Sequence, residues 1–160
     1  MAKKKPRNKK TNTPEKILPN YSGRNTPQKE LKGIDKVSER PFQWSLEYCH
    51  WEHRGWNDVT LSSFANRIIK KLKDCEGQTW HEIETASGGK THGSNSHFIS
   101  GDKLPKQEKK YFMEQGYMRN FEKVFSFRLS GKERLIGFRD KAIFVVLWYD
   151  PCHEFFPSTR

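Results

Sequence analysis

The sequence predicts an α+β fold in which helices pack on one face of a small sheet. Three observations lead to this prediction. A segment with strand-like alternation comes first, at residues 42–49, and two or three segments with helical spacing follow it, between residues 57 and 116. The last part of the chain, residues 122–149, holds three β-rich runs separated by gaps of hairpin length.

The first strand and the first helix are predicted from hydrophobic periodicity. Residues 42–49, FQWSLEYC, place alternate apolar side chains on one side, which is typical of a half-buried strand. Gly55 then interrupts the pattern, and Asn57 or Asp58 offers a helix cap. The apolar residues with helical spacing after that cap are Leu61, Phe64, Ala65, Ile68, Ile69 and Leu72. Gly77 ends the predicted helix.

Two shorter helices follow. Thr79 and Glu82 form the pattern of a capping box, so a short helix should begin there with Trp80 and Ile83 on its inner side. Residues 104–116 predict another helix, because Pro105 stands at its start and Gly116 at its end.

The end of the folded part predicts three strands, at residues 122–129, 134–139 and 142–149. The gaps between them are short enough for hairpins, so the strands should form an antiparallel meander. Alternation along 134–139 places Arg134 and Arg139 on opposite faces, and therefore Arg128, Arg134 and Arg139 cannot all share one face.

Charge divides the chain into a leader and a body. Residues 1–40 hold twelve basic and four acidic residues, a net charge of +8, whereas residues 41–160 carry only +3. The leader has four prolines and few apolar residues, so we expect residues 1–40 to be disordered and residues 41–160 to form the α+β domain. The run KKKPRNKK could contact nucleic acid without sequence preference or serve only as a solubilising leader, and both interpretations stay open.

The expected location is the cytoplasm. Three cysteines form no metal-binding pair, and their odd number argues against a disulfide framework. The basic N-terminus leads into no apolar segment of a signal peptide. The longest apolar run, residues 142–148, is far too short to span a bilayer, so no membrane partner is expected.

The order of a strand, a pair of helices and a terminal meander resembles the RelE/ParE-like superfamily, the toxins of bacterial toxin–antitoxin pairs. Residues 125–158 are also similar to a poorly characterised bacterial and phage family whose pattern is FSxRLSGKxRxxGxRxxxxxxxLWxDPxHxxxP. In that family a glycine-rich stretch ending in a His-Ser-His-like element precedes the pattern. Here the stretch is SGGKTHGSNSHF, and the resemblance covers roughly residues 42–157.

The resemblance implies a basic-faced domain that acts on translation, often by cutting messenger RNA at the ribosome, with an acidic antitoxin as a protein partner. Some superfamily members inhibit DNA gyrase instead. The ribonuclease members use arginines on the central strands, nearby lysines and a C-terminal tyrosine, which correspond to Arg128, Arg134, Arg139 and Tyr149. The family pattern commonly has Trp at the position of Tyr149, so the resemblance does not establish a catalytic hydroxyl there.

Cleavage of RNA without a metal needs a base for the 2′-hydroxyl, a cation for the phosphorane and an acid for the leaving oxygen. Histidine titrates near neutrality, so His97 is the candidate acid or base. Arg128, Arg134 and Arg139 are the candidate cations, with Lys132 at the hairpin tip as a binding residue. The alternative is that one or two of the arginines form structural salt bridges with Glu133, Asp140 or Asp150.

The loop ASGGKTHGSNSH at residues 86–97 admits several interpretations. A P-loop is excluded because its pattern requires glycine where the chain has Glu84, and no apolar strand precedes it. Metal binding is disfavoured, since the histidines follow no ligand spacing. A substrate loop in which Lys90 and His92 bind RNA is narrowly preferred over a solvated connection.

Aromatic residues offer a second signal for RNA, because bases can stack on them. Trp44, Trp80 and Trp148 lie on predicted element faces, where core packing is the favoured role, whereas Trp51 and Trp56 are expected to be the exposed pair. The residues after the last strand could place His153 near the site, but we favour a loop position in which the neighbouring Phe155 and Phe156 cover the sheet edge.

Together these observations predict an RNA-binding, metal-independent endoribonuclease of toxin type that needs no cofactor. Its catalytic residues would be Arg128, Arg134, His97 and Arg139, and its substrate-binding residues Lys90, His92, Lys132 and Tyr149. The alternatives are a non-catalytic module that binds RNA or protein, and a ParE-like inhibitor of gyrase.

Overall fold

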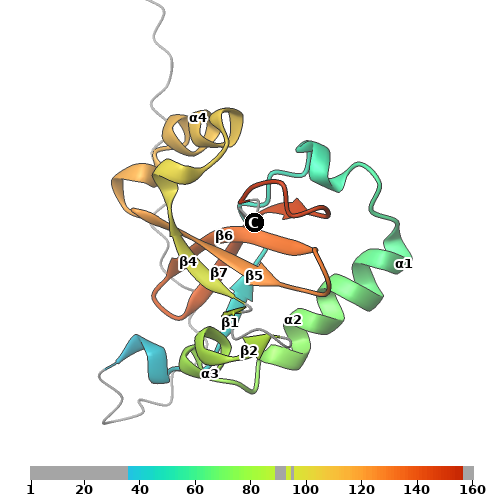
Figure 1. Ribbon diagram of the computed structural model, residues 1–160, viewed down its shortest axis with the longest axis vertical. Helices are drawn as coiled ribbons and strands as arrows, with labels where there is room; N and C mark the ends of the chain where they lie inside the picture. The colour runs from blue at the N-terminus through green and yellow to red at the C-terminus, as the bar shows by residue number, and fades with distance from the viewer. Residues whose placement is uncertain (1–35, 89–92, 95, 157–160) are drawn as a thin grey trace, which may run out of the picture. The chain divides into compact units, whose positions relative to one another are not determined.

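The computed structural model describes residues 36–88, 93–94 and 96–156. In this part of the chain one mixed sheet has the strand order β1-β7-β6-β5-β4 (Figure 1). Its strands are β1 (Gln43–Ser45), β4 (His97–Ser100), β5 (Lys123–Arg128), β6 (Arg134–Asp140) and β7 (Ile143–Asp150). A separate pair consists of β2 (Ser87–Gly88) and β3 (Gly93–Ser94). The predicted α+β class is confirmed, while residues 1–35 of the predicted leader lie outside the described residues.

The predicted meander is confirmed, because β5, β6 and β7 pair antiparallel in sequence order. The first strand is shorter than predicted and runs parallel to β7, with Gln43 opposite Ile143. It ends at Ser45 because the Ser45 hydroxyl accepts the Glu47 amide at 3.2 Å and the chain then turns. Strand β4 was not predicted, and it extends the sheet beside β5 within a region assigned to a loop.

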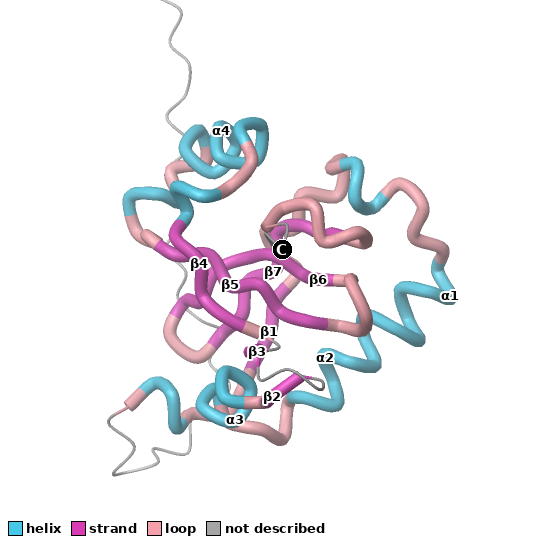
Figure 2. Tube along the Cα trace, in the orientation of Figure 1, coloured by secondary structure: helices cyan, strands magenta, loops and turns pink. Residues whose placement is uncertain are grey.

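The helix over residues 61–75 consists of α1 (Leu61–Ser63), a π-helical stretch (Phe64–Ile69) and α2 (Lys70–Cys75) (Figure 2). The predicted cap at Asn57 or Asp58 is wrong, since Thr60 caps the helix by accepting the Ser63 amide at 3.1 Å. Asn57 instead follows the 3-10 turn η2 (Arg54–Trp56), and its backbone amide donates to the Arg54 carbonyl. The helix has ended by Gly77, as predicted.

The two shorter helices are confirmed. Helix α3 (Trp80–Thr85) begins with the predicted capping box of Thr79 and Glu82. Helix α4 (Lys106–Glu114) begins after Pro105 and is followed by Gly116, whose φ of 76° is left-handed. The remaining turns are η1 (Val37–Glu39), η4 (Gly101–Lys103) and η5 (Tyr117–Arg119). None of the helices in the described ranges is long and apolar enough to cross a membrane.

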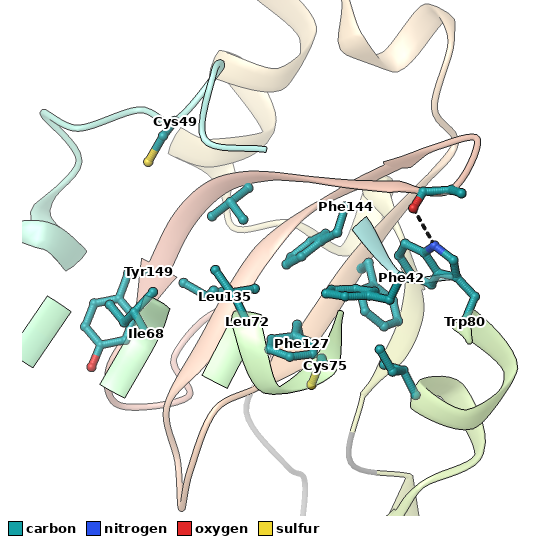
Figure 3. Close-up of a cluster of buried hydrophobic side chains, with 14 of the residues drawn as sticks. Phe42, Cys49, Ile68, Leu72, Cys75, Trp80, Phe127, Leu135, Phe144 and Tyr149 are labelled. Carbon is teal, nitrogen blue, oxygen red and sulfur yellow. Dashed lines mark hydrogen bonds between the residues drawn. The ribbon is translucent and has the colours of Figure 1, made fainter. Parts of the chain in front are cut away.

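Helices cover both faces of the sheet, so the prediction that they lie on one face is wrong. On the α2 face, as we name it, Phe127, Leu135 and Phe144 pack against α2 and α3, and the indole of Trp80 donates to the Ala142 carbonyl at 2.8 Å (Figure 3). On the opposite α4 face, Ile136, Val145 and Trp148 pack against α4 and η5. Figure 1 shows α4 and α2 on different sides of the sheet. The physical reason is that strands β5–β7 are apolar on both sides and need a cover on each.

A β-bulge in β7 decides which side chains reach each face. Ile136 pairs with Trp148, but Gly137 pairs with Val146, so Leu147 is an extra residue. Leu147 and Trp148 therefore both join the α4 face, and Tyr149 returns to the α2 face. A Cβ atom on Gly137 would lie 1.9 Å from the Val145 carbonyl oxygen, which explains why glycine occupies this position.

Candidate functional site

The predicted residues His97, Arg128 and Arg134 come together at one end of the sheet, on its α4 face. Arg128 pairs with Arg134 across β5 and β6, and Arg134 pairs in turn with Asp150 on β7. His97 pairs with Ser126, two residues before Arg128 on the same face. We call His97, Arg128, Arg134, Asp150 and the nearby His153 the strand-end site.

Arg134 is the most constrained cation of the strand-end site. The residue is only 9% exposed, and its Nη1 donates to the carbonyl oxygens of Gly131 at 3.0 Å and Glu133 at 2.9 Å. Burial and the charge of Arg128 lower the pKa of Arg134, while the charge of Asp150 opposes them. The Nε atom is buried and has no hydrogen-bond partner in the described part of the chain. The guanidinium is thus fixed in place while one donor stays unsatisfied.

His97 lies half-buried at the start of β4. Burial lowers the pKa of its imidazole below the ordinary value, and the charges of Arg134 and His153 act in the same direction. Its Nδ1 is buried and has no partner among residues that the structure describes. A neutral imidazole with a vacant nitrogen can accept a proton from a bound hydroxyl. The buried Ser96 hydroxyl accepts the Arg128 amide at 3.1 Å and so joins the start of β4 to the end of β5.

Asp150 organises the loop after β7. Its Oδ1 accepts the amides of Cys152 at 3.3 Å and Glu154 at 2.9 Å, and its Oδ2 accepts the Phe155 amide at 3.0 Å. His153, at the middle of this loop, has a left-handed φ of 62°. Phe155 is buried against Trp148 and belongs to the α4-face core, so it does more than cover an edge. His153 lies in a loop, as predicted, and its charge lowers the pKa of His97.

Arg139 and Tyr149 are not part of the strand-end site. Arg139 lies on the α2 face, where it forms a 2.6 Å ion pair with Glu84 and stands over the rings of Trp80 and Phe98 at 5.0 and 4.6 Å. The opposite placement of Arg134 and Arg139 agrees with the prediction from alternation. The ion-pair partner is Glu84, which was not among the predicted ones.

The hydroxyl of Tyr149 donates to Glu133 at 2.5 Å, and Glu133 also pairs with Arg67 at 2.5 Å and accepts from Ser130. Burial raises the pKa of Tyr149, and its hydrogen bond to Glu133 adds to that effect. Burial alone would raise the pKa of Glu133, but these hydrogen bonds and the Arg67 charge lower it overall. The network ties the β5–β6 turn to the helix over residues 61–75.

Of the predicted binding lysines and histidine, Lys132 is exposed in the β5–β6 turn, next to Gly131 with its φ of 46°. Lys90 and His92 lie outside the described residues. No group of three or more His, Cys, Asp or Glu side chains within residues 36–88, 93–94 and 96–156 has the arrangement of a metal site.

A second polar cluster on the α4 face was missed at the sequence level. His53 and Glu108 are both buried, with 2.9 Å between Nε2 and Oε1, and His53 Nδ1 accepts the Gly55 amide at 3.2 Å. His50 accepts from the Trp148 indole at 3.2 Å and stacks on Tyr111 at 4.0 Å. The signal in the sequence was the four-residue spacing of Glu108 and Phe112, which places both on one side of a helix. In the structure both are buried on the inner side of α4.

An aromatic pocket of about 380 Å³ lies at the start of the helix over residues 61–75, lined by Trp51, Trp56, Val59, Leu61 and Phe64. The expectation of an exposed tryptophan pair holds for Trp51, which is 51% exposed, but not for Trp56, which is 7% exposed. Trp80 and Trp148 are fully buried as expected, and Trp44 is partly buried with its indole donating to Glu76 at 2.8 Å.

Comparisons of the chain with known proteins do not identify a family for it. No protein-family model matches the chain, no curated protein matches it, and no solved structure matches it.

Proposed function

We propose that this protein is a metal-independent endoribonuclease that cleaves RNA at the strand-end site. The observation that carries the proposal is a pair of buried nitrogens, His97 Nδ1 and Arg134 Nε, that have no hydrogen-bond partner among residues 36–88, 93–94 and 96–156 and lie on one sheet face beside a second arginine. Buried polar atoms without partners are rare in folded proteins, and a catalytic role is one of the explanations for them. A phosphodiester with its neighbouring 2′-hydroxyl offers an anion to Arg134 and a hydroxyl to His97, so it would give both side chains a hydrogen-bond partner.

In the proposed reaction His97 removes the proton of the 2′-hydroxyl, and the 2′-oxygen attacks the phosphorus. The lowered pKa of His97 keeps its imidazole neutral and able to accept that proton near neutral pH. Arg128 and Arg134 neutralise the charge that gathers on the phosphate oxygens, for which planar guanidinium groups are suited. The products carry a 2′,3′-cyclic phosphate and a 5′-hydroxyl.

The finer proposal is that the fold is RelE-like and the protein is the toxin of a toxin–antitoxin pair, cutting messenger RNA at the ribosome and binding an acidic antitoxin. The element order and the motif at residues 125–158 support it. The small α+β fold and the cations at one end of its sheet are compatible with this proposal.

The test is cleavage of a labelled single-stranded RNA by the purified protein in excess chelator, comparing His97→Ala and Arg134→Ala with the wild type. Loss of general-base catalysis is expected to slow cleavage about 10²- to 10⁴-fold, and loss of the arginine about 10²- to 10³-fold. His81→Ala and Arg40→Ala are the matched controls, because both side chains are exposed and lie outside the site. Equal cleavage by all five proteins, or none by the wild type, contradicts the proposal.

Induced expression in bacteria tests the toxin proposal separately. Growth arrest with new internal 5′ ends in transcripts, both absent in the His97→Ala strain, is the expected result. Arrest with intact transcripts would point to gyrase or another protein target. RNA binding in vitro without any cleavage would favour the non-catalytic module.

A further inference from the structure

We propose that His153 is the second proton-transfer group of the strand-end site and protonates the departing 5′-oxygen of RNA. This inference rests on the proposed ribonuclease function and adds a residue and a role to it. In the complete step the 2′-hydroxyl proton passes to His97, the bond between the 2′-oxygen and phosphorus forms, and the bond to the 5′-oxygen breaks. A proton from the His153 imidazolium goes to that oxygen, and exchange with water then restores both histidines.

The need for such a group follows from the state of His97. A histidine that is neutral and acts as the base cannot also donate the proton that the leaving oxygen requires in the same step. An alkoxide is a poor leaving group, so an enzyme that works near neutral pH needs a separate acid. That acid must hold a proton near neutral pH and release it readily.

The other polar groups of the site are unsuited to this role. Arg128 and Arg134 hold their protons far too tightly to act as acids near neutrality. Asp150 is 3% exposed, and both of its carboxylate oxygens accept backbone amides, so the carboxylate is engaged in holding the loop. Tyr149 lies on the α2 face with its hydroxyl bound to Glu133. Among the described residues of the strand-end site, His153 is the one histidine besides His97.

The loop has the construction expected of one that positions a side chain. Three backbone amides converge on the Asp150 carboxylate, and Phe155 fixes the far end of the loop by packing against Trp148 at a ring distance of 5.7 Å. Between these anchors His153 adopts a left-handed φ of 62°, which is uncommon outside glycine and in which asparagine, aspartate and histidine are enriched. Strained backbone of this kind persists where the surroundings impose it, and it is concentrated at functional sites.

The surroundings of His153 combine charged groups with access to solvent. Its side chain is half-buried and reaches solvent, so water can reprotonate it after each turnover. The charged and titratable groups of its own loop are Asp150 and Glu154. On the neighbouring strands they are Arg134 opposite Asp150, Arg128 opposite Arg134, and His97, whose pKa the charge of His153 lowers. Glu154 is engaged by Arg54 at 3.2 Å. Asp150, where this loop begins, lies on the same face of the sheet as Arg134 and His97.

The test uses two RNA substrates that differ in one atom at the scissile position. One has the ordinary 5′-oxygen, and the other has sulfur in its place, which leaves as a thiolate without needing an acid. The variant is His153→Asn, because asparagine tolerates the left-handed backbone and cannot donate a proton in catalysis. His153→Gly is a second variant, because glycine also adopts the left-handed backbone. Thermal unfolding establishes that both variants are folded.

We expect His153→Asn to cleave the ordinary substrate about 10²- to 10⁴-fold more slowly than the wild type and the sulfur substrate at nearly the wild-type rate. His97→Ala should lose activity on both substrates. The wild-type rate should decline at high pH, where the acid is deprotonated, and His153→Asn should lack that decline. An equal loss on both substrates, or no loss on the ordinary one, overturns the role of His153 while the ribonuclease proposal stands. Absence of cleavage by the wild type overturns both.

Discussion

Replacement of Arg139 by alanine separates a structural arginine from a catalytic one. In the sequence this residue was a catalytic candidate equal to Arg134, but it lies on the opposite face in contact with Glu84 and two rings. We therefore expect Arg139→Ala to destabilise the fold and to leave the rate of RNA cleavage within about twofold of the wild type, since the strand-end site is untouched.

The magnitude follows from three contacts. The ion pair is partly exposed, with 29% of the Arg139 side chain and 32% of the Glu84 side chain accessible, so it contributes about 0.5–1 kcal/mol. Each ring contact, with Trp80 and with Phe98, adds about 0.5–1 kcal/mol. The expected decrease in the free energy of unfolding is about 1.5–3 kcal/mol.

The assay is urea unfolding followed by tryptophan fluorescence, combined with the cleavage assay on the same preparations. Glu84→Gln is the matched variant, because it removes the ion pair and leaves both ring contacts. It should lose only about 0.5–1 kcal/mol, and the double variant should show coupling of that size. A variant Arg139→Ala with wild-type stability and greatly reduced cleavage would refute the assignment of this arginine to the fold.

Three further predictions concern the fold. The lowered pKa of Glu133 stabilises the folded state at pH values above the unfolded-state pKa of about 4.3. This contribution is lost as the pH falls through the lower folded-state pKa. In denaturant titrations between about pH 6 and 3, the free energy of unfolding of Glu133→Gln should therefore depend less on pH than that of the wild type. Gly137→Ala forces a Cβ atom to within 1.9 Å of a carbonyl oxygen and should lower thermal stability severely, whereas Gly77→Ala, with open space around it, should melt like the wild type. Thr79→Ala removes the capping box and should cost about 1 kcal/mol in urea unfolding, while retention of wild-type stability would show that α3 does not depend on its cap.

The elements with strong local signals were predictable from the sequence. The capping box at Thr79 and Glu82 and the boundaries at Pro105 and Gly116 depend on contacts between near neighbours, which a sequence shows directly. The meander followed from three β-rich runs with short gaps. The start of the first helix was mispredicted because Asn57, Asp58 and Thr60 are all acceptable caps, and the preceding 3-10 turn selected Thr60.

The error about the layers had a signal in the sequence. Residues 142–149 form an apolar run without alternation, and such a run is typical of a strand that is covered on both faces. Strand β4 could not be predicted in the same way. It is a four-residue edge strand at the end of a glycine-rich stretch, and its existence depends on long-range pairing with β5.

The candidate site was predicted in part for a physical reason. Alternation along β6 separated Arg134 from Arg139, and the hairpin brought Arg128 beside Arg134, so these two predicted arginines share one site with His97. The bulge at Leu147 could not be predicted, and it determines that Tyr149 faces away while Asp150 faces Arg134. The proposed role of His153 depends on how Asp150 folds the following loop, and these hydrogen bonds are visible only in the structure.

The central claim is that the strand-end site cleaves RNA through the 2′-hydroxyl. The most direct measurement is incubation of the wild-type protein, in excess chelator, with a DNA strand that contains a single ribonucleotide. The account predicts one cut on the 3′ side of that ribonucleotide, a 2′,3′-cyclic phosphate on the product, and no cut in the all-DNA strand or with His97→Ala. Cleavage of the all-DNA strand, or cleavage that survives the loss of His97, would contradict it.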